Sequence, residues 1–221
     1  MRFPRPVKAV VFDMDGLLIN SEVIVRDAMM AVAREMGAEL PNEVFVRMVG
    51  LTYAASDAVA QAHFGPDFPL EAFNAAVWKR AEQAFEAEDI LKAGVREIVD
   101  HLEAAGIPRA VCTSSSHETV RRHLAPSGLY DRFQAIVARG DYAHGKPSPD
   151  PYLLAAERLG VAPADCLALE DSHNGVRAAH AAGAMTIMVP DLLDPTPEMR
   201  RLCIAIAESL HDVREALAAS H

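Results

Sequence analysis

Short apolar runs alternate along the chain with longer segments whose apolar residues recur at helical spacing. The run at residues 7–12 is rich in valine and ends at Asp13, a pattern typical of a strand buried on both faces of a parallel sheet. The alternation predicts an α/β fold whose core is a Rossmann-like, doubly wound parallel sheet. Further strands are predicted at 110–112, 135–137, 167–169 and 185–189, with helices at 95–105, 118–124, 151–159 and 175–182.

Residues 18–88 interrupt this alternation, because they show helical patterns without a convincing strand among them. We therefore predict an all-helical domain at 18–88, inserted into a core formed by residues 1–17 and 89–221. The helical patterns of the insert lie at 23–36, 43–49, 53–64 and 70–85.

Composition and charge narrow the class of protein. Of the 221 residues, 51% are hydrophobic and 24% are charged, which is ordinary for a globular protein. The formal net charge is −10, so we expect neither nucleic acid nor a membrane surface as a partner. Three cysteines without a CxxC pair, together with the lack of a signal-peptide pattern or a long apolar run, indicate a cytoplasmic protein.

Two carboxylates directly follow the first predicted strand, at the kind of position where functional groups gather in a doubly wound sheet. Asp13 and Asp15 are two residues apart and are followed by Gly16, which lets the chain turn sharply. Crowded carboxylates that point into one site require a cation or a proton. Asp and Gly are also common turn formers, so a solvated turn is the alternative.

A hydroxyl-rich loop and a constrained lysine follow later in the chain. Thr113 and Ser114 lie ahead of a predicted helix, where hydroxyls and backbone N–H groups either bind phosphate or only cap the helix. Lys146 lies between a glycine and a proline. This placement suits a fixed counter-charge for a phosphoryl group, and a plain helix start is the alternative.

A second pair of acids, Glu170 and Asp171, directly follows another apolar strand. Carboxylate oxygens at this point, brought close to Asp13, would form a magnesium site, since Mg²⁺ is commonly held by a few carboxylates together with water and substrate phosphate. The alternative is a helix cap formed by Asp171 or Ser172 at the start of the next helix.

These candidates belong to four motifs: FDMDG at 12–16, VCTSS at 111–115, GKPSPDP at 145–151 and LEDSHNG at 169–175. In this order they resemble the motifs of the haloacid dehalogenase-like hydrolase superfamily, in the group with a helical C1-type cap inserted after the first motif. The motifs span nearly the whole predicted core. The predicted cap carries no motif as specific as these four, so the resemblance says little about the cap.

The resemblance implies a role for each catalytic side chain. Asp13 would be the nucleophile that becomes an aspartyl-phosphate, and Asp15 would protonate the leaving oxygen and later deprotonate water. Thr113, the backbone N–H of Ser114 and Lys146 would surround the transferring phosphoryl group and stabilise its charge.

The resemblance also implies a Mg²⁺ cofactor. It would be held by the Asp13 side chain, the backbone carbonyl of Asp15 and the Asp171 side chain. Glu170 would be either a direct ligand or a residue lying behind the direct ligands. Because the second acid of the first motif is present as Asp15, carbon–halogen cleavage is disfavoured.

We expect a phosphatase that hydrolyses a small phosphorylated metabolite, such as a sugar- or nucleotide-like phosphate monoester, and that acts as a monomer. A β-phosphoglucomutase-like phosphotransferase is the alternative, because such enzymes share these motifs and this cap type. Their loop matching residues 50–53 carries a basic residue for a second phosphate, whereas Tyr53 is neutral, which favours hydrolysis. A non-catalytic phosphate-binding regulatory protein is the alternative from another class.

Substrate selection is expected to come from the cap. Tyr53, Lys79 and Arg80 are the predicted selecting residues, from their positions near the first cap loop and on the last long cap helix. For Lys79 and Arg80 the alternative is a solvated helix face.

Overall fold

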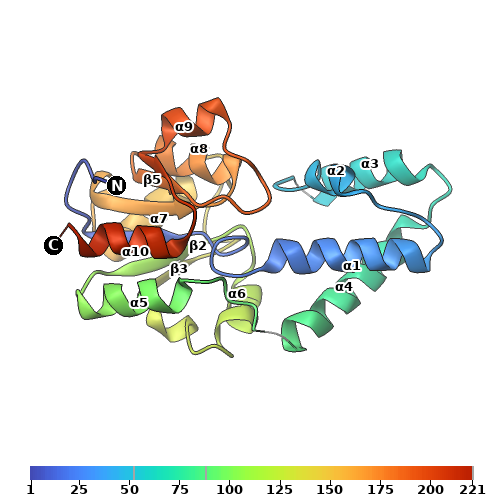
Figure 1. Cartoon of the computed structure of the whole chain (residues 1–221), viewed down its shortest axis with the longest axis horizontal. Helices are drawn as coiled ribbons and strands as arrows, with labels where there is room; N and C mark the ends of the chain where they lie inside the picture. The colour runs from blue at the N-terminus through green and yellow to red at the C-terminus, as the bar shows by residue number, and fades with distance from the viewer. Residues whose placement is uncertain (52, 88, 221) are drawn as a thin grey trace. The chain divides into compact units, whose positions relative to one another are not determined.

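The computed structural model describes residues 1–51, 53–87 and 89–220, and the chain divides into two compact units (Figure 1). One unit comprises Met1–Ile19 and Leu91–His221, and the other comprises Asn20–Ile90. The chain therefore passes between units after residues 19 and 90, where the sequence predicted passages after 17 and 88. Glu88, the last residue of the predicted insert, and Thr52 of the predicted cap loop lie outside the described residues.

The first unit is built on a six-stranded parallel sheet with the strand order β3-β2-β1-β4-β5-β6. This order confirms the predicted doubly wound sheet, because the chain reverses its direction of growth between β1 and β4. The strands are β1 (Ala9–Phe12), β2 (Arg109–Cys112), β3 (Ala135–Val137), β4 (Cys166–Glu170), β5 (Met185–Met188) and β6 (Ala205–Ile206).

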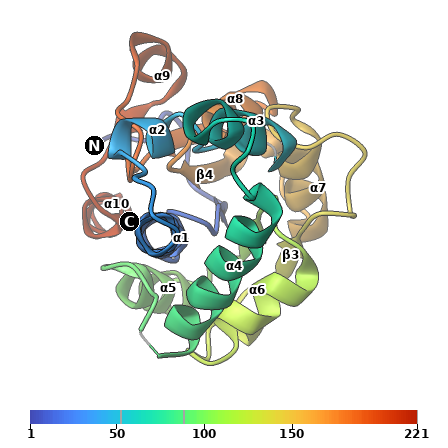
Figure 2. The same ribbon diagram turned by 90° about the vertical axis from the view of Figure 1, so that its right-hand side faces the viewer.

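Helices cover both faces of this sheet. α7 and α8 lie on one face and α5 and α10 on the other (Figure 2). The strands line the face under α7 and α8 with small buried residues such as Ala9, Ala110 and Ala168, which let the helices approach the strands closely. The helices of this unit are α5 (Val95–Ala104), α6 (His117–Leu124), α7 (Asp150–Leu159), α8 (His173–Ala181), α9 (Pro197–Leu202) and α10 (Leu210–Ala218).

The second unit is helical throughout its described residues. α1 and α4 pack along one another, and the rings of Phe64, Phe68 and Phe73 form an aromatic cluster in which Phe73 is fully buried. The helices are α1 (Ser21–Glu35), α2 (Asn42–Val46), α3 (Tyr53–Phe64) and α4 (Leu70–Ala87). Within the described ranges, none of the chain's helices has both the length and the apolar character needed to cross a bilayer.

The hydrogen-bond ladders of the sheet continue just past the ends of the strands. Asp13 donates its N–H to Leu169 O at 3.0 Å, and Thr113 donates its N–H to Val137 O at 2.9 Å. The residues that follow β1, β2 and β4 are therefore fixed at the carboxyl edge of the sheet, where ligands bind in open α/β folds.

Candidate active site

Lys146 lies at the centre of the polar cluster on this edge. Its Nζ donates to Asp13 Oδ1 at 2.5 Å, to Glu170 Oε1 at 2.6 Å and to the carbonyl oxygen of Cys112 at 2.9 Å. The side chain of Lys146 is only 7% exposed, and those of Asp13 and Glu170 are 10% and 0% exposed. The ammonium thus joins the ends of β1, β2 and β4 in a setting that solvent screens little.

The loop that carries Lys146 is held at its far end by Asp150, the first residue of α7. Asp150 accepts hydrogen bonds from Ser148 Oγ at 2.8 Å and from the backbone N–H of His144 at 3.2 Å. These bonds close the loop over the start of α7, so the GKPSPDP motif both begins a helix and places a lysine. The predicted helix start is confirmed, and the role of Lys146 as a counter-charge for a phosphoryl group stays a prediction.

Glu170 is bound on both carboxylate oxygens. Oε1 accepts from Lys146 and from the buried Tyr152 hydroxyl at 2.6 Å, and Oε2 accepts from Ser172 Oγ at 3.1 Å. A Cβ built at Gly175 would overlap this carboxylate, so the glycine of LEDSHNG makes room for it. Of the two capping residues that the sequence left open, Ser172 caps α8: its side chain accepts from the Gly175 N–H at 3.1 Å.

Three acids converge beside Lys146. Oxygens of Asp13, Glu170 and Asp171 lie within 4.8 Å of one another, and all three residues are buried. A Cβ built at Gly16 would overlap Asp171 Oδ2, so the glycine of the first motif lets the chain pass close to this acid. Hard carboxylate oxygens gathered in this way fit a Mg²⁺ ion. These three acids are among the four residues that the sequence assigned to the metal site; the fourth, Asp15, was assigned through its backbone carbonyl.

Asp15 takes part in a separate set of hydrogen bonds. Its Oδ2 accepts from Thr113 Oγ1 at 3.2 Å and from Ser115 Oγ at 2.8 Å. Thr113 Oγ1 in turn accepts from the Ser115 N–H at 3.0 Å. Asp15 therefore faces the loop after β2, and the exposed Ser114 lies between its two partners.

Burial and charge act in opposite directions on the ionisation of this cluster. Burial raises the pKa of Asp13 well above its usual value, and Lys146 opposes that rise. Burial lowers the pKa of Lys146, but the charges of Asp13 and Glu170 outweigh burial and hold the pKa well above its usual value. Lys146 thus stays charged at neutral pH. Burial and Glu170 raise the pKa of Tyr152, so its hydroxyl keeps the proton that it donates.

The predicted selecting residues all lie in the second unit. Tyr53 is 65% exposed, and its ring meets that of Trp78, itself exposed, edge-on at 6.1 Å between centroids. Lys79 is exposed on α4. Arg80 donates to Glu35 at 2.5 Å, so its charge is partly balanced within the unit.

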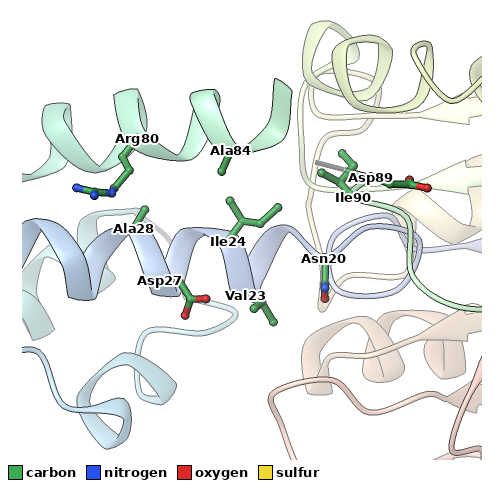
Figure 3. Close-up of a pocket in the computed structure, with 9 residues that line it drawn as sticks. All are labelled: Asn20, Val23, Ile24, Asp27, Ala28, Arg80, Ala84, Asp89 and Ile90. Carbon is green, nitrogen blue, oxygen red and sulfur yellow. The ribbon is translucent and has the colours of Figure 1, made fainter. Parts of the chain in front are cut away.

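Arg80 also lines a pocket of about 220 Å³ between α1 and α4. Ile24 and Ala28 of α1 face Ala84 and Arg80 of α4 there (Figure 3). No sequence pattern indicates this pocket, because it arises from the pairing of two helices that are not consecutive in the chain.

Two residues that contact the cluster were missed in the sequence. Tyr152 is 2% exposed and binds Glu170. A tyrosine on the inner side of a predicted helix needs a partner for its hydroxyl, and this signal could have identified it. Ser115 was recognised only as part of a hydroxyl-rich loop, and nothing in that loop shows which hydroxyl reaches Asp15.

Comparison with known proteins agrees with this geometry. A family model described as haloacid dehalogenase-like hydrolase matches residues 7–183. Hexitol phosphatase B of Escherichia coli (strain K12) is 35% identical over 199 residues, which are 86% of either chain. The solved structure of a HAD family hydrolase from Deinococcus radiodurans R1, with bound phosphate and sodium, is similar with a TM-score of 0.82 at 30% identity. The match covers 97% of this chain and 96% of that chain.

A β-phosphoglucomutase from Clostridium difficile is also similar in structure, with a TM-score of 0.71 at 18% identity. The likeness covers 97% of this chain and 98% of that chain. At this identity it shows a shared fold alone.

We predict that Gly16→Ala weakens Mg²⁺ binding about 10-fold or more, the size of loss typical when the surroundings of a metal ligand are disturbed, because the new Cβ displaces Asp171. Gly183→Ala is the matched control: its φ of +83° equals the +84° of Gly16 within a degree, and nothing lies within 4 Å of its Cβ. Both variants should lose roughly 1–2 kcal/mol of stability through left-handed backbone strain. Titration calorimetry with Mg²⁺ measures the difference, and equal affinities in the two variants would contradict the placement of Asp171.

Proposed function

Since the chain belongs to the haloacid dehalogenase-like hydrolase family, we propose that it is a Mg²⁺-dependent phosphatase that forms an aspartyl-phosphate on Asp13. Its substrate is a small phosphate monoester, of a sugar-like or nucleotide-like alcohol. The observation that carries the proposal is the contact of the Lys146 ammonium with Asp13, beside a cluster of acids and a hydroxyl-rich loop. A positive charge fixed at the nucleophile offers an anionic substrate a binding partner in a chain whose net charge is −10.

In the first step a carboxylate oxygen of Asp13 attacks phosphorus and the bond from phosphorus to the ester oxygen breaks. The carboxyl group of Asp15 gives its proton to the leaving alcohol oxygen. Thr113, the Ser114 N–H and Lys146 stabilise the charge on the phosphoryl oxygens, which is the main requirement of phosphoryl transfer.

In the second step water attacks the phosphorus of the aspartyl-phosphate. Asp15, now a carboxylate, takes a proton from that water, and the bond between phosphorus and the Asp13 oxygen breaks to release phosphate. The same side chain thus moves a proton in each direction, and the hydroxyls of Thr113 and Ser115 hold it in place between steps.

The residues proposed to hold Mg²⁺ are Asp13, Asp171 and the backbone carbonyl of Asp15, with Glu170 adjacent. When bound, the ion supplies positive charge that favours the ionised form of Asp13 and neutralises the substrate phosphate. Burial raises the pKa of Asp13, and the charges of Glu170 and Asp15 add to that rise. The charges of the ion and of Lys146 therefore both support the carboxylate that attack requires.

Hydrolysis is preferred to a mutase reaction because of Tyr53. A mutase of this group holds a second phosphate with a basic residue in the matching loop, and the neutral Tyr53 packs its ring against Trp78 instead. The relative named hexitol phosphatase B supports a polyol or sugar phosphate as the class of substrate. Tyr53, Lys79 and Arg80 remain the residues proposed to select among such substrates.

We predict that the purified chain hydrolyses hexitol and hexose phosphates, that EDTA stops the reaction and that added Mg²⁺ restores it. Released phosphate measures the rate. The Asp13→Asn variant, purified in the same way, is the control for a contaminating phosphatase, and it should be inactive because an amide is not a competent nucleophile. Full activity in EDTA would remove the metal from the mechanism. A chain that binds phosphate but turns over none of these esters with Mg²⁺ would instead be a non-catalytic binding protein.

The proton transfer assigned to Asp15 leads to a prediction about leaving groups. Asp15→Asn should lose roughly 10²–10⁴-fold in kcat/KM, the usual contribution of a general acid, for a hexitol phosphate. The loss should be smaller for p-nitrophenyl phosphate, whose leaving oxygen needs little protonation. Steady-state kinetics with both substrates test this, and equal losses would argue against Asp15 as the acid.

A further inference from the structure

Tyr142 contacts the loop that follows β2. It lies on the segment between β3 and α7, and its ring packs against the buried residues under α7 and α8. Its hydroxyl donates to the carbonyl oxygen of Thr113 at 3.1 Å and shares a hydrogen bond with the Ser114 side chain. Burial raises the pKa of Tyr142, so the phenol keeps the hydrogen that it donates.

The turn before Tyr142 binds the same loop at a second point. The N–H of Arg139 donates to the carbonyl oxygen of Ser115 at 2.8 Å. Ser115 is the residue whose hydroxyl binds Asp15 and whose N–H binds Thr113. Residues 139–142 therefore hold the segment Thr113–Ser115 by the backbone carbonyl oxygens at both of its ends.

Asp141 fixes this turn to the rest of the unit. Its carboxylate accepts from the Ala138 N–H at 3.1 Å, from Arg158 Nη1 at 2.8 Å and from His117 Nε2 at 3.0 Å. Arg158 also donates to Ile136 O at 2.6 Å. Burial raises the pKa of Asp141, but hydrogen bonds from Arg158 and His117 outweigh it and lower the pKa well below its usual value. The carboxylate thus remains charged and joins β3, α6 and α7.

We propose that Tyr142 is a positioning residue for phosphate binding: from a turn anchored by Asp141, it fixes the backbone of Thr113 and Ser114 so that this loop presents its donors to a phosphoryl group. The proposal rests on the proposed function, because it takes the loop to be the phosphate site. Tyr142 itself does not touch the phosphate. Without its hydrogen bond the carbonyl of Thr113 is free to turn, and the peptide N–H of Ser114 turns with it, since the two belong to one planar unit.

The test compares Tyr142→Phe with Tyr130→Phe, which also removes one phenol oxygen in the same unit. The Tyr130 ring packs on Arg121, 4.8 Å from its guanidinium carbon to the ring centroid. We measure the dissociation constant for inorganic phosphate in the presence of Mg²⁺, the affinity for Mg²⁺ alone, and kcat and KM for p-nitrophenyl phosphate. Tyr142→Phe should weaken phosphate binding about 10-fold, the effect of losing one well-placed hydrogen bond, raise KM and lower kcat. Mg²⁺ affinity should not change, and Tyr130→Phe should match the wild type.

The outcomes separate this inference from the proposed function. If the wild type hydrolyses phosphate esters and Tyr142→Phe binds phosphate as tightly as Tyr130→Phe, the inference is wrong and the function stands. If the wild type hydrolyses none but Tyr142→Phe still weakens phosphate binding, the positioning role stands and the proposed function fails. Equal losses of phosphate and Mg²⁺ affinity would indicate general damage to the fold and would also overturn the inference. A second variant, Asp141→Asn, should weaken phosphate binding in the same direction by loosening the turn.

Discussion

The buried contact of Lys146 with two carboxylates is the interaction on which the rest of this site depends. An ammonium and two acids removed from water are unstable unless each finds charged or hydrogen-bonding partners. Lys146 meets this need with Asp13, Glu170 and the carbonyl of Cys112. The acids in turn are close enough to need its charge. Removing Lys146 would leave two buried carboxylates without their positive partner.

The parallel sheet is what makes that cluster possible. β1, β2 and β4 are neighbours and run in the same direction. Their carboxyl ends, at Phe12, Cys112 and Glu170, therefore meet at one edge of the sheet although they are far apart in the sequence. Glycine at positions 16 and 175 then allows acids to approach the backbone where any Cβ would overlap them. An ammonium is thus fixed beside the Asp13 carboxylate of a chain whose net charge is −10.

Much of this arrangement could be predicted from the sequence, because the strand-end motifs carry strong local signals. The valine-rich run before Asp13 and the order of the four motifs led to the sheet and to the acids, hydroxyl and lysine that the structure brings together. β6 was missed because it has two half-buried residues and no periodicity. α10 was missed although Ser209 and Asp212 form a capping box, a readable signal. Tyr142 acts through a backbone carbonyl far away in sequence, and no pattern reports such a contact.

Capture of the phosphoryl group on Asp13 is the most direct test of the whole account. The chain is mixed with a substrate labelled in its phosphate, quenched in acid within milliseconds and digested, and the label is mapped to a peptide. We predict an acid-stable, hydroxylamine-sensitive label on the peptide that contains Asp13. With p-nitrophenyl phosphate as substrate, the label should reach a higher level in Asp15→Asn than in the wild type. The Asp13→Asn variant should carry no label. Turnover by the wild type or by Asp15→Asn without such a label, or a label on another residue, would contradict the account.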